Sequence, residues 1–121
     1  MSNNFERLKQ ATLCLSQDGP LKDRLAEAWA SHLEAVECEA LPESLRGEFR
    51  SLGDAMHRVT PEVRESAVRA SVRKMSVQEA REHAALVVRV FAAMARAEAV
   101  PAALLPRGRA SAVRQLYAAE G

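Results

Sequence analysis

Cysteine, glycine and aromatic residues are all scarce in this 121-residue chain, and isoleucine is absent. The two cysteines, Cys14 and Cys38, are too few for a disulfide framework, and neither has the Cys-x-x-Cys spacing of a zinc or redox site. The five glycines are scattered, so the sequence has no glycine-rich loop for binding phosphates. We therefore expect free thiols, which are usual in a reducing cytoplasm.

Long hydrophobic runs are also missing. The most apolar stretch, residues 84–100, is interrupted by Arg89, Arg96 and Glu98, and it is shorter than the roughly 20 residues that a membrane helix needs. The first residues have no basic segment followed by an apolar one, so they lack the pattern of a secretion signal. These absences predict a cytoplasmic protein that does not bind membranes.

The composition that remains is typical of one globular domain, with 48 % hydrophobic and 27 % charged residues. Apolar residues recur at helical spacing, and no convincing strand pattern occurs. The sequence therefore predicts an all-α fold, a compact bundle of five or six helices. We expect the bundle over residues 1–100. Residues 101–121 are expected to be a C-terminal tail with a short helix that packs on the bundle or on a partner chain.

Capping residues, glycines and prolines set the expected ends of the helices. Three residue pairs have the pattern of a helix start: Asn3 with Glu6, Thr60 with Pro61, and Ser76 with Glu79. The expected helices cover residues 4–17, 20–38, 42–58, 61–75 and 77–99, and the short tail helix covers about residues 110–119.

The helix expected at residues 77–99 is apolar on nearly every side, which is typical of a central, buried helix. The helix before it has two apolar sides. Together these faces exceed what one small bundle easily covers, so we expect a symmetric homodimer. This reasoning selects five interface residues: Val68, Val72, Met75, Leu86 and Val90.

No group of side chains in the sequence has the spacing of a catalytic, metal or cofactor site. His32, His57 and His83 lie on different expected helices, and none has a second histidine at helical spacing. Neither cysteine has an obvious base partner. The chain is therefore expected not to be an enzyme, with no catalytic residue, no metal and no cofactor.

One histidine lies in the middle of an apolar stripe. His32 follows Trp29 at helical spacing, and the two could line a pocket for a small ligand or form a pH-sensitive contact. The alternative is a half-buried histidine with one polar partner.

Charge is nearly balanced, at +1 overall, but unevenly distributed: residues 1–59 carry −3 and residues 60–121 carry +4. A cluster of basic residues on the helix expected at 61–75 could contact the phosphates of DNA or RNA: Arg64, Arg69, Arg73 and Lys74. Glu65 precedes Arg69 at i, i+4 spacing, which is also typical of a solvated helix face with ion pairs of its own.

Two segments resemble small all-helical bacterial proteins of unknown function. They are residues 68–76, and residues 21–25 followed by Leu41-Pro42. The resemblance covers about residues 5–99, and it implies no activity and no functional residue.

Taken together, these features favour a non-enzymatic protein-binding module. We expect an adaptor, inhibitor or regulator that forms a homodimer and binds a second, unidentified protein. The alternatives are a nucleic-acid-associated regulator that uses the arginine cluster, and a small-ligand-binding protein with a pocket near Trp29 and His32.

Overall fold

We describe a computed structural model of the chain over residues 3–61 and 64–99. The described residues form helices and no strand, which confirms the predicted all-α bundle. In chain order the elements are α1 (Asn4–Leu15), α2 (Leu21–Ala28), the π-helical turn η1 (Trp29–Leu33), the 3-10 turn η2 (Cys38–Ala40), α3 (Glu43–Met56), α4 (Ala67–Lys74) and α5 (Val77–Ala99).

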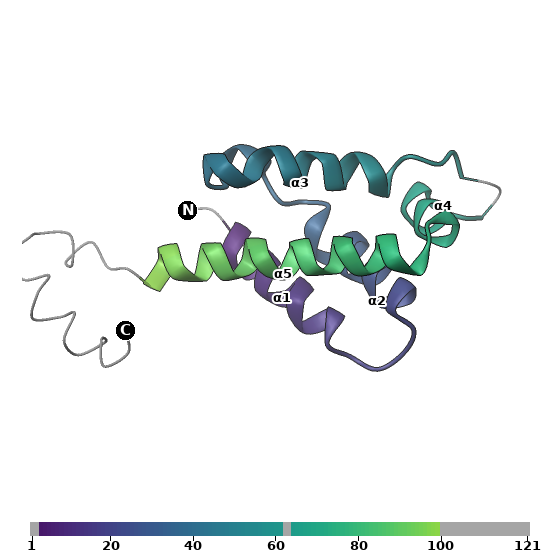
Figure 1. Ribbon diagram of the computed structural model, residues 1–121, viewed down its shortest axis with the longest axis horizontal. Coiled ribbons are helices and arrows are strands. Elements are labelled where there is room, and N and C mark those ends of the chain that lie inside the picture. The colour runs from purple at the N-terminus through teal and green to yellow at the C-terminus, as the bar shows by residue number, and fades with distance from the viewer. Residues whose placement is uncertain (1–2, 62–63, 100–121) are drawn as a thin grey trace, which may run out of the picture.

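The long helix α5 lies in the middle of the bundle, as its apolar sequence predicts. Helices α1 and α2 pack on one side of α5, and α3 runs alongside α5 on the other (Figure 1). Helix α4 contacts α2 and α3 and closes the end of the bundle at which α5 begins. Because α3 and α5 are antiparallel, the start of α3 lies toward the C-terminal half of α5.

Apolar side chains from every α-helix share one core. Two stacked aromatic pairs join elements that are distant in sequence. The Phe5 and Phe91 rings lie 5.7 Å apart and connect α1 to α5, and the Trp29 and Phe49 rings lie 5.6 Å apart and connect η1 to α3. Such offset pairs stabilise a core beyond the area that they bury.

The largest difference from the predicted helices concerns the start of α4. The expected start at Thr60 and Pro61 is wrong, because α4 begins at Ala67 and the hydroxyl of Ser66 accepts the N–H of Arg69. Before that cap the chain includes Arg64, which has a positive φ of 70°. The Ser66 cap gives an orphan N–H at the start of α4 a partner.

Two other predicted ends also differ. Asn3 precedes α1 but makes no side-chain cap bond, so the expected capping box does not form there. The predicted second helix ends early, since α2 passes into the π-helical turn η1 and stops near Leu33. At Ser76, by contrast, the hydroxyl accepts the N–H of Glu79, as the predicted cap requires. The helix expected at residues 110–119 lies outside the described residues.

The five residues selected for a dimer interface are buried within a single chain. Each is at most 7 % exposed: Val68, Val72, Met75, Leu86 and Val90. The expected interface is therefore corrected, because packing of α4 and α5 against the rest of the same chain covers the apolar faces that the sequence left over.

Candidate functional site

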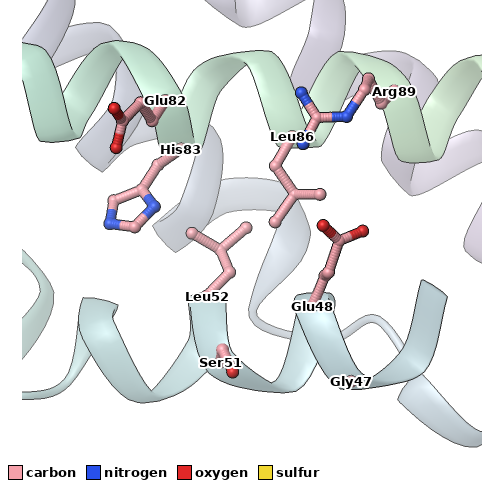
Figure 2. A pocket seen from close by; sticks show the side chains of 8 residues that line it. All are labelled: Gly47, Glu48, Ser51, Leu52, Glu82, His83, Leu86 and Arg89. Carbon is pink, nitrogen blue, oxygen red and sulfur yellow. The ribbon is translucent and has the colours of Figure 1, made fainter.

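A groove lies between α3 and α5, with residues of both helices along its sides. Its volume is about 350 Å³. Leu52 of α3 and Leu86 of α5 point toward each other and form its floor (Figure 2). Polar side chains surround this floor: Glu48 and Ser51 on α3, and Glu82, His83 and Arg89 on α5. The groove thus combines an apolar floor with charged rims.

Further hollows continue the groove toward α4. A second hollow of about 390 Å³ shares Ser51 and is lined by Asp54, Arg58 and Glu79. A third of about 210 Å³ shares Arg58 and Glu79 and reaches α4. The groove therefore follows α3 and α5 from the level of Arg89 to the start of α5.

An ion-pair network lies in the part of the groove near the start of α5. The Arg58 guanidinium donates to Glu79 Oε2 at 2.6 Å, and His83 Nε2 lies 3.3 Å from the same oxygen. The hydrogen bond from Arg58 lowers the pKa of the Glu79 carboxyl, although desolvation opposes the shift and His83 adds a smaller lowering effect. Glu79 is thus a carboxylate at neutral pH that joins the end of α3 to α5.

The sides of the first two hollows also carry charged side chains without such partners. Glu48, Asp54 and Arg89 are exposed, and none forms an ion pair with another residue in the described part of the chain. Four carboxylates and two guanidinium groups line the first two hollows, which leaves an excess of two negative charges. A ligand of this groove would therefore meet a mildly acidic surface.

The predicted arginine cluster is partly neutralised by neighbouring carboxylates. Arg69 pairs with Glu27 at 3.2 Å, and Arg73 donates two hydrogen bonds to Glu65 at 2.8 and 2.9 Å. The remaining members of the cluster, Arg64 and Lys74, are exposed. Two of the four basic residues thus have carboxylate partners, one on α2 and one just before α4.

The predicted pocket residues lie apart from the groove. Trp29 is only 3 % exposed, stacks on Phe49, and donates its indole N–H to Glu34 Oε1 at 2.6 Å. The same oxygen lies 3.0 Å from Nε2 of His57, whose Nδ1 lies 2.8 Å from the carbonyl oxygen of Gly53. Trp29 is therefore part of the core and of a polar contact between η1 and α3.

His32 is half-buried, which is compatible with either interpretation of this residue.

The thiol of Cys14 does not have the environment of a reactive thiolate. Both cysteines are free and half-buried. Burial raises the pKa of the Cys14 thiol, and the nearby Glu27 carboxylate raises it further, so this thiol stays protonated at neutral pH. Within residues 3–61 and 64–99, no three histidine, cysteine or acidic side chains are grouped to hold a metal ion.

The sequence did not reveal the groove. Glu48 and Asp54 are ordinary exposed residues of an amphipathic helix, and Glu82 and Arg89 belong to a narrow polar stripe of α5. Only the packing of α5 determines which of its edges faces α3. The sequence therefore does not show that these charged residues would flank Leu52 and Leu86.

No protein family, curated protein or solved structure matches this chain. No helix in the described ranges is both long enough and apolar enough to cross a membrane.

Proposed function

We propose that this chain is a non-enzymatic protein-binding module whose α3–α5 groove accepts an amphipathic helix of a partner protein. The observation that carries the proposal is the combination of a Leu52–Leu86 floor with unpaired charges on both rims. Amphipathic helices bind in grooves of this kind through apolar residues at positions i, i+3, i+4 and i+7. The free thiols support the proposal that the module works in a reducing cytoplasm.

The charges of the groove define the chemistry of the partner. Excess carboxylates at Glu48, Asp54 and Glu82 favour a helix whose polar face carries arginine or lysine. An unpaired acidic residue of that helix would fit only beside Arg89. Complementary charges of this type raise the association rate and fix the orientation more than they raise affinity.

Selection of helical peptides against the full chain tests this proposal. The probe is a phage-displayed library of 16-residue helical peptides, and selected peptides are then measured by fluorescence anisotropy. We expect apolar residues at helical spacing and flanking basic residues in the selected peptides. We also expect Glu48→Lys combined with Glu82→Lys to weaken their binding at least tenfold.

Two further comparisons test whether the selected peptides bind in the groove and not elsewhere on the protein. Glu6→Lys makes one such charge reversal on α1, which packs on the other side of α5, and should leave binding within about twofold. Gly47→Leu fills the groove, whereas Gly47→Ala leaves it open, because a Cβ at Gly47 meets no atom within 4 Å. Peptides that bind the Gly47→Leu variant and the double-charge variant as tightly as they bind wild type would overturn the proposal.

A specific observation also supports the expected homodimer, but on a different surface. Leu13 of α1 and Val88 of α5 are 47 % and 43 % exposed, and the two helices that carry them pack against each other. The exposed Ala85 lies on the same side of α5 as Val88. Small residues there would let a helix of a second copy approach closely, as in other helix pairs.

Sedimentation velocity tests the dimer directly. We expect the wild-type chain to sediment as a dimer and Leu13→Asp with Val88→Asp to sediment as a folded monomer. Ala35→Asp with Ser44→Asp adds the same charge at exposed positions on other segments and should remain dimeric. A wild-type monomer at tens of micromolar would rule out the homodimer.

A further inference from the structure

We infer that the ligand of the α3–α5 groove includes the chain's own C-terminal segment, residues 101–121, which occupies the groove within the same molecule and competes with partner helices. This inference rests on the proposed helix-binding function of the groove. It concerns a segment that follows directly on α5, one of the two helices that form the groove.

The composition of the segment matches the groove. It carries Arg107, Arg109 and Arg114 against one acidic residue, Glu120, whereas the groove has an excess of two carboxylates. On a helix over residues 110–119, three apolar side chains would share one face: Val113, Leu116 and Tyr117. Charge and apolar pattern thus satisfy the requirements derived above for a partner helix.

The length of the segment also fits. The groove begins at Arg89, ten residues before the end of α5 at Ala99, and ten helical residues span about 15 Å. Residues 100–109 extend over as much as about 33 Å, which is enough to reverse direction and return to Gly47 and Arg89. A ten-residue helix is about 15 Å long, the same as the distance along α5 from Arg89 to Glu79.

Proline and glycine in the connecting residues favour a reversal. Pro101 is a residue that disfavours a longer helix in this sequence, because a proline inside a helix removes a hydrogen bond and clashes with the preceding turn. Pro106 and Gly108 flank Arg107 in the pattern of a turn. A segment tethered beside its own binding site has an effective concentration in the millimolar range, so even weak contacts would keep partner helices out.

Competition between the tethered segment and the same sequence as a free peptide tests this inference. The probe is a fluorescent peptide of residues 101–121, measured by anisotropy with the full chain. We expect wild type to bind it at least tenfold more weakly than a full chain that carries Val113→Asp and Leu116→Asp, because the altered segment no longer covers the groove. Adding Glu48→Lys and Glu82→Lys to that variant should abolish the gain.

A matched control distinguishes the loss of apolar side chains from the effect of the added negative charge. Ser111→Asp and Gln115→Asp put the same charges on the opposite face of the expected helix and should leave peptide binding as weak as in wild type. Equal peptide affinity in wild type and in the Val113→Asp/Leu116→Asp chain, or no binding to either, would overturn the inference.

The remaining outcomes distinguish this inference from the proposed function. If the selected helical peptides bind the groove but the 101–121 peptide does not, the function stands and the inference fails. If neither probe binds, both fail. If Val113→Asp/Leu116→Asp converts a dimer into a monomer in sedimentation, the segment reaches a second copy, and occupancy within the same molecule is overturned.

Discussion

Asn4 holds the backbone of Glu37 through two reciprocal hydrogen bonds. Its side-chain Nδ2 donates to the Glu37 carbonyl oxygen at 2.9 Å, and its Oδ1 accepts the Glu37 N–H at 3.0 Å. Asn4 is completely buried although it is polar. The first turn of α1 is thereby fixed to the connection between η1 and η2, and both polar groups of that backbone residue have a partner.

Removing the Asn4 side chain should therefore destabilise the bundle. We expect Asn4→Ala to lower the free energy of unfolding by about 2 kcal/mol, because a buried donor and a buried acceptor at Glu37 lose their partners. The neighbouring Asn3→Ala is the control, since Asn3 is exposed and makes no cap bond, and it should stay within about 0.5 kcal/mol of wild type. Urea unfolding followed by circular dichroism measures both. Equal losses in the two variants would contradict the role given to Asn4.

The two glycines inside α3 should respond to alanine in the same direction. Gly47→Ala should stabilise the protein by about 0.5–1 kcal/mol, because alanine has the higher helix propensity and its Cβ at this position meets no other atom. At Gly53 the added Cβ would lie 3.6 Å from the Trp29 ring, an ordinary van der Waals distance, so Gly53→Ala should also stabilise.

A larger side chain at Gly53 should instead destabilise, because it would displace Trp29. Thermal unfolding of Gly53→Ala and Gly53→Leu compares the two cases. A fall in melting temperature for Gly47→Ala would contradict the open environment assigned to that residue.

The serines that cap α4 and α5 should contribute equally to stability. The Ser66 hydroxyl accepts the Arg69 N–H at 3.0 Å, and the Ser76 hydroxyl accepts the Glu79 N–H at 2.9 Å. Replacing either serine with alanine should cost about 1 kcal/mol, whereas Ser66→Asp keeps an acceptor and should retain most of the stability. Thr60→Ala is the decisive comparison, because Thr60 lies well before α4. A loss of stability in Thr60→Ala but not in Ser66→Ala would instead support the helix start at Thr60 that the sequence predicts.

Stability should depend on pH through Glu79. The folded state lowers its pKa, chiefly by the hydrogen bond from Arg58. The contribution is therefore complete above the ordinary glutamate pKa of about 4.3 and is lost as the pH falls through the lower, folded-state pKa. Arg58→Gln should cost up to about 1 kcal/mol at pH 7, and this difference should disappear in strongly acidic solution.

Arg50→Gln provides the matched control for that pH series. Arg50 and Glu39 lie 3.6 Å apart, and both side chains are more than half exposed, so their pair should contribute almost nothing. Urea unfolding of wild type and both variants at several pH values measures the differences. A constant difference between wild type and Arg58→Gln across the series would contradict the assigned linkage.

The sequence by itself determined the helical class and most of the helices. Regular apolar spacing predicts α3 and α5 almost to the residue, since a helix must bury the side of its surface that carries Phe49, Leu52 and Met56. Ser76 also revealed the start of α5, because a cap bond forms between residues only three positions apart and needs no tertiary contact.

Tertiary structure decided how these helices cover one another and hence where the candidate site lies. The apolar sides of α4 looked like surplus surface in sequence, but Val68 and Val72 are buried when α4 contacts α2 and α3. The sequence around Asn4 does not predict its hydrogen bonds to Glu37, because the two residues are 33 positions apart. The groove exists because α5 turns its Leu86 edge toward Leu52, and that rotation depends on side-chain packing between distant segments, which helical periodicity does not encode.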